Sequence, residues 1–596
     1  MLKKSKFPLM LSCGALALSS LAKPAFSFSV EDLQDTPEQP NVVVILADDI
    51  GYMDLGVYGS EISTPNIDRL AERGVKFSNY HTSASCAPSR AMLLTGVDNH
   101  LAGVPSLPET LPPEQAAVEN YQGVLSDNVV TVASVLNAEG YHTYMAGKWH
   151  LGKETEKLPY NRGFERTIAM GDSGADNWEH RPYMPLYEDA FWTRDGEEIR
   201  LDDPFYSSEL IVDEMIDFIE SDIDDGQPFF SYLPFLAAHQ PVQAPAEYTD
   251  LYLDTYEDGW QALREDRHDT AMEIGLVPEG SDLVTHEFID DWDSLNEEEQ
   301  QFEAKRMAVY AGMITAMDYH IGRFIEYLDE TGELDNTIFI VTSDNGPEYN
   351  ILTPGNIRMM GYTNEYDDLG EFGSYNDIGM NWASAAASPL SLFKFYAGEG
   401  GLRVPLIISG PGIEQQDGFQ NAFTYVTDIT PTILAMTGIE QPQGRFGGRP
   451  IEPITGKDLT PILDGSSDLI YQADDYIGYE VGGNLALFQD GYKLVLNREP
   501  YGDNEFYLFD IVNDPGETRD LKAQNPVQFQ KMLNLYQRYE DDNGVLPVPD
   551  HYILGNEINQ KGIRINAGEN LTIVLFVGLT VGIFSLFGWQ RKKYQR

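Results

Sequence analysis

Four apolar runs, each leading into a stretch that carries polar or charged residues, constrain the fold of this chain most strongly. The runs span 41–46, 141–145, 228–233 and 337–341. Continuous apolar runs of this length indicate strands buried on both faces, as in parallel sheets covered by helices. Because ligands bind at the carboxyl ends of the strands in open α/β sheets, we expect the polar groups after these runs to lie in one crevice.

The segments between the runs predict the helices that cover such a sheet. Apolar residues recur with a spacing near 3.6 in 131–138, in 208–219 and most clearly in 302–328, where Gly332 follows the expected end. The chain has 596 residues, which exceeds the size at which a single core stops growing. We therefore predict an α/β fold with a mostly parallel central sheet flanked by helices, together with at least one further packed unit.

The pattern changes near Gly456, from long buried runs to short strands. Three strand-like runs separated by turn residues, and a polar helix after them, occupy 485–489, 493–497, 505–510 and 527–539. Short strands with turn signals between them are typical of an antiparallel meander. We therefore predict a large α/β domain over 38–456 and a small antiparallel α+β subdomain over 457–550.

Both ends of the chain have patterns typical of export and membrane attachment. Basic residues, an apolar run and then small residues indicate a secretory signal peptide over 1–27. Residues 571–589 carry no charge and would span about 28 Å as a helix, close to the ~30 Å of a bilayer core. The basic residues within 590–596 indicate a short cytoplasmic tail. We therefore expect an exported protein anchored in the cytoplasmic membrane by a transmembrane helix, with its main domain outside; a sorting tail that is later removed is the alternative.

The charge of the chain limits its partners. It has 95 acidic and 39 basic residues, a net charge of −56, with the acidic residues spread along the chain. Nucleic acid is excluded as a partner, because phosphate binding needs clustered lysine and arginine. A solvated surface suited to a salty environment and a cationic partner both remain open. If the substrate is an anion, its site must be a local positive island.

Acidic and amide side chains follow two of the predicted strands. Asp48 and Asp49 come directly after the first run, and Asp344 and Asn345 follow the fourth. Oxygen ligands of this kind suit Ca²⁺ or Mg²⁺ rather than zinc, which prefers histidine and cysteine. An Asp-Asp pair after a strand is by itself more often a cap or a turn. The matching Asp-Asn-Gly after a second strand is what favours a metal site.

Cations are scarce in the chain, yet they recur at predicted strand ends. Lys148 and His150 follow the second run, His239 follows the third, and Lys394 precedes a glycine-rich turn at 399–401. Taken singly, a lysine is usually solvated and a histidine is usually packed. Their recurrence at these positions favours a site for an anion.

The chain has two cysteines, and only Cys86 lies outside the apparent export signal. A mature exported protein with a single cysteine has no disulfide framework. Core packing, intermolecular pairing and chemistry are therefore the three explanations for Cys86. It stands in the stretch Cys86-Ala87-Pro88-Ser89-Arg90, which continues to Leu94-Thr95-Gly96.

This stretch resembles the signature of the type I, formylglycine-dependent sulfatases, Cys-x-Pro-Ser-Arg followed by Thr-Gly. Four further motifs fit that family in the expected order, at 47–51, 147–152, 343–346 and 399–405. The resemblance covers about 41–525 and is closest to the bacterial arylsulfatases. It implies an alkaline-phosphatase-like fold with a mixed, mostly parallel sheet. It also implies hydrolysis of sulfate esters, either aryl sulfates or sulfated carbohydrates, to an alcohol or phenol and inorganic sulfate.

The resemblance implies an unusual nucleophile. In this family the signature cysteine is oxidised to formylglycine, so Cys86 would be modified and a formylglycine-generating enzyme would be a partner during maturation. One hydroxyl of the hydrated aldehyde, a geminal diol, attacks the sulfur, and the other helps to eject sulfate as the aldehyde forms again. An ordinary serine would be left carrying a stable sulfate ester.

The resemblance also implies one metal ion, Ca²⁺ in preference to Mg²⁺. The family positions of its ligands, together with an oxygen of the modified Cys86, are Asp48, Asp49, Asp344 and Asn345. The ion would polarise the sulfate and favour the attacking alkoxide.

The remaining family roles fall on the cations and histidines. Arg90 would hold the diol and the metal site in place. Lys148, His239 and Lys394 would contact the sulfate, and His239 would be the general acid for the leaving oxygen. His150 would take the proton from the second hydroxyl as sulfate is released.

Two rival functions remain at this point. A phosphonate monoester or phosphodiester hydrolase of the same superfamily would share the metal site and the aldehyde. An anchored module that binds sulfated glycans without turnover would need no catalysis. The acidic segment 248–301 and the long loop 346–391 are expected to set the choice among aryl, alkyl and polysaccharide sulfates. The sequence indicates neither this substrate, nor exo or endo action, nor an oligomeric state.

Overall fold

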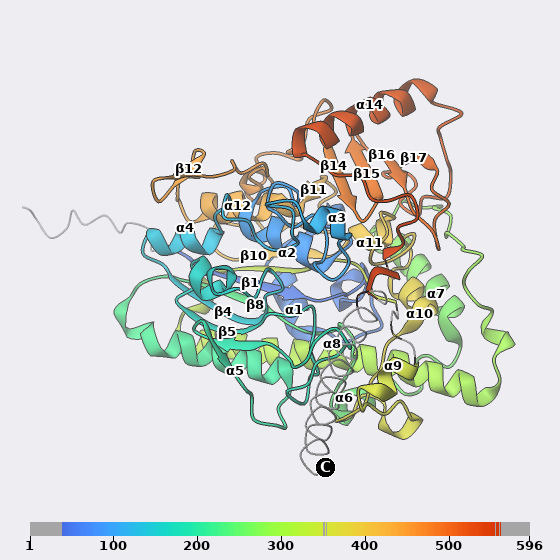
Figure 1. The fold of residues 1–596 in the computed structure, drawn as a ribbon, viewed down its shortest axis with the longest axis horizontal. Helices are drawn as coiled ribbons and strands as arrows, with labels where there is room; N and C mark the ends of the chain where they lie inside the picture. Colours follow the sequence, from blue (N-terminus) through green and yellow to red (C-terminus); the bar gives the residue numbers. More distant parts are fainter. Residues whose placement is uncertain (1–38, 350–351, 353, 555, 559–560, 562–596) are drawn as a thin grey trace, which may run out of the picture. The chain divides into compact units, whose positions relative to one another are not determined.

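The computed structural model describes residues 39–349, 352, 354–554, 556–558 and 561. Its central element is a nine-stranded mixed sheet with the strand order β2-β10-β9-β1-β8-β4-β5-β6-β7 (Figure 1). The five inner strands run parallel, and the strands at both edges are antiparallel. The mixed, mostly parallel sheet predicted from the sequence is therefore confirmed.

The four apolar runs form four neighbouring strands at the centre of this sheet. They are β9 (Thr337–Ser343), β1 (Asn41–Ala47), β8 (Phe229–Pro234) and β4 (His142–Lys148). Nearly all of their residues are buried, as expected for strands covered on both faces. Because the strands are parallel, all four carboxyl ends lie at one edge. The outer strands are β5 (Arg166–Met170), β10 (Leu406–Ser409), β2 (Gly74–Phe77), β6 (Trp192–Arg194) and β7 (Glu197–Ile199).

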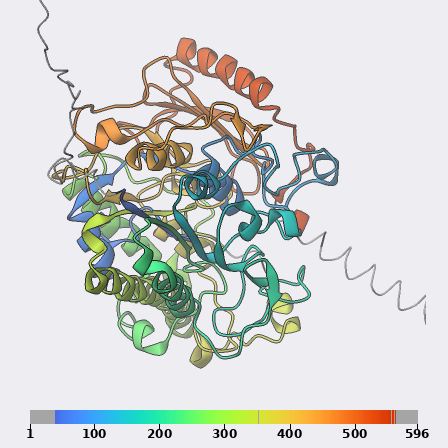
Figure 2. The same ribbon diagram turned by 90° about the vertical axis from the view of Figure 1, so that its left-hand side faces the viewer.

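Helices cover both faces of the sheet (Figures 1 and 2). One layer contains α1 (Pro65–Ala71), α5 (Ser207–Asp222) and α8 (Glu297–Thr331). The other contains α2 (Cys86–Thr95), α4 (Val132–Ala138) and α12 (Ile429–Met436). The longest helix, α8, begins at a capping box in which the Asn296 side chain accepts hydrogen bonds from the first-turn amides, and ends at the left-handed Gly332.

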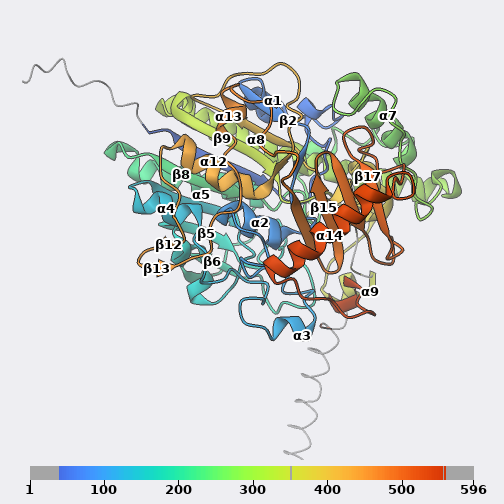
Figure 3. The ribbon, with the colours of Figure 1, turned by 90° about the horizontal axis from the view of Figure 1, so that it is seen from above.

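A second, four-stranded antiparallel sheet lies beside the first. It is a meander of β14 (Ile477–Val481), β15 (Asn484–Gln489), β16 (Tyr492–Leu496) and β17 (Phe506–Asp510). The apolar side of α14 (Pro526–Asn543) covers one face of it (Figure 3). The other face packs on Ala84, Ala397 and Leu402, next to the strand ends of the large sheet. The meander was predicted except for β14, whose apolar pattern is interrupted by glycine and glutamate. The division of the chain at 456/457 stays a prediction.

The acidic segment and the segment expected to be a long loop both contain helices. The acidic segment carries α6 (Ala246–Thr249) and α7 (Gly259–Glu273), and the second segment carries α9 (Pro354–Met359) and α10 (Gly379–Ala386). Edge-to-face tryptophan contacts join Trp260 and Trp292 to Trp382 on α10. The remaining short elements are α3 (Pro113–Ala116), α11 (Glu399–Leu402), α13 (Thr460–Leu463), β3 (Tyr80–His81), β11 (Thr424–Tyr425), β12 (Arg445–Phe446) and β13 (Arg449–Pro450).

The predicted membrane helix requires a correction. Within the part of the chain that the structure describes, no helix is both long and apolar enough to cross a bilayer. The longest helix, α8, has acidic and basic residues in its first turns. The segments 1–27, 571–589 and 590–596 lie outside the described residues. The transmembrane helix predicted as part of the fold, and the predicted anchoring in the cytoplasmic membrane, are therefore not supported. The α/β class with a mixed sheet is retained.

Candidate active site

Cys86 is the first residue of α2, a helix in which all ten residues are buried. The side chain reaches the strand ends, where its Sγ lies 3.8 Å from Oδ1 of Asp49. Since Cys86 is 1% exposed, intermolecular pairing is excluded as its use in the folded chain. Burial raises the pKa of the Cys86 thiol well above its ordinary value, so the unmodified side chain is a poor nucleophile.

The ends of β1 and β9 bring three carboxylates to this cysteine. Ligand atoms of Asp48, Asp49, Asp344 and Cys86 all lie within 4.8 Å of one another. Asn345 joins them, because its Nδ2 donates to Oδ1 of Asp49 over 2.6 Å. In the described structure, Oδ1 of Asp48 and Oδ1 of Asn345 are buried and accept no hydrogen bond, although Oδ1 of Asp48 lies 3.4 Å from Nη2 of Arg90. The five residues predicted as metal ligands therefore form one cluster.

The electrostatics of this cluster favour a bound cation. Burial raises the pKa of Asp48 to about 8 and that of Asp49 to about 7. Burial also opposes ionisation of Asp344, but the adjacent Arg90 guanidinium lowers the pKa of that carboxyl. A divalent ion would stabilise all three as carboxylates, and the oxygens that accept no hydrogen bond are ligands of the type that hard cations prefer. The residues present therefore fit a metal ion.

The three predicted cations lie against these carboxylates, and each is fully buried or 1% exposed. Arg90 donates from Nε and Nη2 to Oδ2 of Asp344 over 2.9 and 2.7 Å, and from Nη1 to the carbonyl of Lys148 over 2.8 Å. Lys148 Nζ donates to Oδ2 of Asp48 over 2.6 Å, and Lys394 Nζ to Oδ2 of Asp49 over 2.8 Å. Three of the chain's scarce cations are thus concentrated at the strand ends, each paired with a carboxylate.

His239 approaches the same oxygen of Asp49 as Lys394 does. Its Nδ1 is 2.6 Å from the carbonyl oxygen of Gln240, which can only accept, so Nδ1 carries a proton. Its Nε2 faces the crevice, 3.8 Å from Oδ2 of Asp49 and 3.3 Å from Oε2 of Glu348. Glu348 also lies 3.3 Å from Lys394 Nζ. Burial lowers the pKa of His239 well below its ordinary value.

His150, two residues after the end of β4, has a left-handed backbone with φ of 55°. Its Nε2 lies 3.3 Å from Oε2 of Glu109, and its Nδ1 is buried without a hydrogen-bond partner in the described structure. Glu109 also accepts a hydrogen bond from the Tyr187 hydroxyl over 2.6 Å. Burial lowers the pKa of His150 to about 4, so the imidazole is neutral near pH 7.

Comparison with known proteins identifies this arrangement. Residues 40–439 match the model of the family described as Sulfatase. The chain belongs to the sulfatase family. It is 35% identical over 549 residues to an uncharacterised sulfatase of Schizosaccharomyces pombe, covering 88% of this chain and 97% of that protein. It is also 35% identical over 433 residues to an arylsulfatase of Klebsiella aerogenes, covering 71% of this chain and 92% of the relative. This sulfatase is therefore a sulfuric ester hydrolase.

Solved structures share its fold. The crystal structure of Ps i-CgsB in complex with k-i-k-neocarrahexaose matches with a TM-score of 0.60 and 23% identity, over 85% of this chain and 93% of that one. A protein in complex with its substrate D-glucosamine-2-N,6-O-disulfate matches with a TM-score of 0.56 and 22% identity, over 85% of this chain and 98% of that one. At these identities the likeness shows the α/β fold with its mixed sheet.

Sequence reasoning missed two acidic residues of this sulfatase's crevice. Glu348 follows the Asp-Asn-Gly motif by two residues, and that proximity is the signal that could have identified it. Glu109 lies in a proline-rich stretch with no strand or motif beside it, and the chain has 95 acidic residues from which to choose. The loop that carries the Asp-Asn-Gly motif packs directly against the glycine-rich turn at 399–401. Gly346 permits this contact, because a Cβ there would lie 1.9 Å from the carbonyl oxygen of Gly400.

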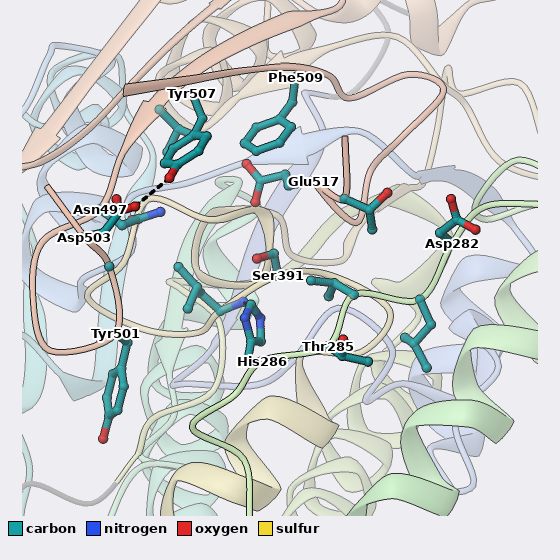
Figure 4. A pocket seen from close by; sticks show the side chains of 16 residues that line it. Asp282, Thr285, His286, Ser391, Asn497, Tyr501, Asp503, Tyr507, Phe509 and Glu517 are labelled. Carbon is teal, nitrogen blue, oxygen red and sulfur yellow. Dashed lines mark hydrogen bonds between the residues drawn. The ribbon is translucent and has the colours of Figure 1, made fainter. Parts of the chain in front are cut away.

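A separate cavity of about 560 Å³ is lined by Ser391 and Leu392 together with residues of the acidic segment and the C-terminal part of the chain (Figure 4). It opens between the meander and the acidic segment, and Asp282, Asp503 and Glu517 contribute its acidic groups. None of its sixteen described lining residues is a lysine or an arginine. A sulfate therefore fits the crevice at the strand ends rather than this cavity.

Proposed function

We propose that this sulfatase hydrolyses aryl sulfates or sulfated carbohydrates at the Cys86 crevice, with Cys86 in its formylglycine form and one calcium ion. The observation that carries this proposal is the convergence of four hard-oxygen side chains and three buried cations on Cys86. The arylsulfatase of Klebsiella aerogenes supports an aryl ester, and the carrageenan and glucosamine disulfate complexes support a sulfated sugar. A formylglycine-generating enzyme is the partner required for maturation.

The two absent groups have defined places in this proposal. Calcium, with magnesium as the weaker candidate, would be held by Asp48, Asp49, Asp344 and Asn345. When bound, the ion polarises the sulfate and the formylglycine supplies the attacking hydroxyl. The fit rests on Oδ1 of Asp48 and Oδ1 of Asn345, which accept no hydrogen bond, and on ligands that are carboxylate and amide oxygens rather than nitrogen or sulfur.

The chain's own cations bind and orient the ester. Arg90 fixes Asp344 through two hydrogen bonds, so the ligand cannot rotate. Lys148 and Lys394 place positive charge near Cys86 and would contact the sulfate oxygens. Both are held by aspartates rather than by solvent, so little reorganisation is needed when the anion enters.

The two histidines would handle the protons. His239 keeps its Nδ1 proton on the Gln240 carbonyl, so Nε2 is the atom that faces the ester. A bound sulfate anion favours the protonated imidazole, which can then donate from Nε2 to the leaving oxygen. His150 is neutral near pH 7 and can accept a proton while sulfate is released.

The mass of the peptide that contains residue 86, measured on purified active protein, tests the proposal. An aldehyde or its hydrate is expected there, and an unmodified thiol in an active preparation would contradict it. Cys86→Ala should abolish hydrolysis of an aryl sulfate. Ser85→Ala is the matched control, since it removes a small buried side chain next to Cys86 whose hydroxyl has no hydrogen-bond partner in the described structure.

An aryl phosphodiester and an aryl phosphonate are the comparison substrates. Faster turnover of either than of the aryl sulfate would reassign the enzyme to the related hydrolases that share this metal site. The contacts of Arg90, Lys148, Lys394 and His239 with the aspartates beside Cys86 argue against a module that binds sulfated glycans without turnover.

A further inference from the structure

We propose that Glu109 is a positioning residue that fixes the tautomer of His150, so that Nδ1 is the atom that accepts the proton. This inference rests on the proposed function, in which His150 acts during sulfate release. It assigns a role to a carboxylate that no motif of the sequence contains.

The contact between the two side chains determines where the imidazole proton lies. An ionised carboxylate has only acceptor atoms. Oε2 of Glu109, 3.3 Å from Nε2 of His150, therefore selects the tautomer protonated at Nε2. The lone pair is then on Nδ1, which is buried without a hydrogen-bond partner in the described part of the chain. The side chains are 9% and 2% exposed, so water competes little for this contact.

Glu109 is itself held in place through its other oxygen. The Tyr187 hydroxyl donates to Oε1 of Glu109 over 2.6 Å and lies 2.8 Å from the Ser173 hydroxyl. The Tyr183 hydroxyl lies 2.6 Å from the same Ser173 oxygen. With both carboxylate oxygens engaged, Glu109 cannot rotate away from His150. A side chain held this firmly can impose one ring orientation on its partner.

The same chain of contacts reaches the second histidine, but in a different way. The Tyr183 ring packs edge-on against the His239 ring, with centroids 5.2 Å apart and planes at 80°. No hydrogen bond between these two rings occurs in the described structure, and Gln240 already sets the His239 tautomer. Glu109 therefore controls the proton position on His150 and leaves that on His239 unchanged.

The test uses Glu109→Gln, which keeps the shape of the side chain. A glutamine amide can donate as well as accept, so it no longer dictates which nitrogen of His150 carries the proton. Glu114→Gln is the matched control, because Glu114 is an exposed carboxylate in the same segment. Tyr187→Phe is a second variant that loosens Glu109 without removing its charge.

The first measurement reads the tautomer directly. Protein labelled with ¹⁵N-histidine is examined by long-range ¹H–¹⁵N correlation, and the His150 signals are assigned by their loss in His150→Gln. The parent and Glu114→Gln should show His150 protonated at Nε2, and Glu109→Gln should show Nδ1 protonation or a mixture. A parent protonated at Nδ1, or an unchanged tautomer in Glu109→Gln, overturns the inference.

The second measurement is steady-state hydrolysis of an aryl sulfate. Glu109→Gln should lower kcat about 100-fold, the size of a general-base contribution, and change KM less than about threefold. Tyr187→Phe should lower kcat about tenfold, since it removes one hydrogen bond to the carboxylate. If both variants lower kcat by the same factor and lower the melting temperature by the same amount, while the tautomer is unchanged, the role of Glu109 is purely structural and the inference is overturned.

Failure of the two proposals is distinguishable. A parent protein without turnover but with the Nε2-protonated His150 contradicts the proposed function and leaves the positioning intact. An active parent whose turnover is unaffected in Glu109→Gln contradicts the positioning and leaves the sulfatase mechanism intact. If Glu109→Gln fails to fold, Tyr187→Phe carries the same two readouts.

Discussion

Two buried ionic clusters of this protein have similar residues but different charge balance. The active-site cluster comprises Asp48, Asp49, Asp344, Glu348, Arg90, Lys148 and Lys394. The junction cluster comprises His81, Glu399, Arg403, Lys493 and Glu517. It lies where the meander packs against the glycine-rich turn at 399–401. In the junction cluster Lys493 Nζ lies 2.8 Å from Oε1 of both Glu399 and Glu517, and His81 Nε2 lies 2.9 Å from Oε2 of Glu399.

The difference is in the number of charges that remain unmatched. In the described structure, the junction cluster sets two carboxylates against one lysine and one arginine, and both oxygens of Glu399 have cationic or imidazole partners. The active-site cluster sets four carboxylates against three fixed cations. A neutralised cluster joins elements of the fold, whereas one with excess acid needs a further cation.

The largest effect is expected from Asp344→Asn in the active-site cluster. The substitution removes a proposed calcium ligand and leaves Arg90 without its charged partner. We expect kcat to fall at least about 10³-fold, from the loss of several kcal/mol of charge stabilisation. Aryl sulfate turnover and bound calcium, measured by elemental analysis, check this. Asp367→Asn, at an exposed position, is the control, and a calcium-loaded variant with full turnover would remove the distinction between the clusters.

The junction cluster should respond in stability. Lys493→Met leaves Glu399 and Glu517 buried without their shared cation, which should lower the free energy of unfolding by about 3–5 kcal/mol. Denaturant unfolding measures this, with the exposed Lys531→Met as control. Adding Glu517→Gln should recover part of the loss, because one of the unpaired charges is removed. Unfolding unchanged in Lys493→Met would show that charge balance does not hold the junction.

A neighbouring contact should make stability depend on pH. His100 is buried between Asp98 and Glu480; burial disfavours its charge, but hydrogen bonds to these carboxylates raise its pKa to about 9. Relative to about 6.5 in the unfolded chain, the shift contributes about 3 kcal/mol. This stability is fully present below about pH 6.5 and is lost as the pH rises through 9. Denaturant unfolding between pH 6 and 10 checks the slope, which His100→Gln should flatten and the exposed His551→Gln should not.

Calcium should stabilise the active-site cluster and not the junction cluster. Calcium at about 100 times its dissociation constant should add about 2.7 kcal/mol to the free energy of unfolding. The increment is measured with calcium and with a chelator. It should persist in Lys493→Met and disappear in Asp344→Asn. The same increment in both variants would place the bound calcium outside the proposed site.

The part of the crevice that was predictable depends on parallel strands. Asp48 and Asp344 are nearly 300 residues apart in sequence, yet β1 and β9 are neighbours in register, so their carboxyl ends coincide. Lys148 and His239 follow from the same rule on β4 and β8. An apolar run that ends in a polar residue is visible in a sequence, and parallel pairing of the strands then brings these ends together. The catalytic roles of these residues stay proposals.

Other partners could not be predicted because they depend on packing between distant segments. Glu109 meets His150 only through the fold of a proline-rich loop, and Lys493 meets Glu399 only because the meander packs against the glycine-rich turn. Neither contact has a periodicity or a motif in sequence. The predicted membrane helix shows the opposite problem: hydropathy alone indicated it, and no described helix has its properties.

The burial of α2 has a consequence for how the enzyme is made. Every residue from Cys86 to Thr95 is enclosed, so a second protein has no access to this segment once the core has closed. If Cys86 is oxidised as proposed, the oxidation has to come before folding, while the stretch is still an extended strand of newly synthesised chain. A molecule that folds before the oxidation would keep its thiol and would be folded but inactive. The cellular yield of active enzyme would then depend on the rate of oxidation relative to the rate of folding.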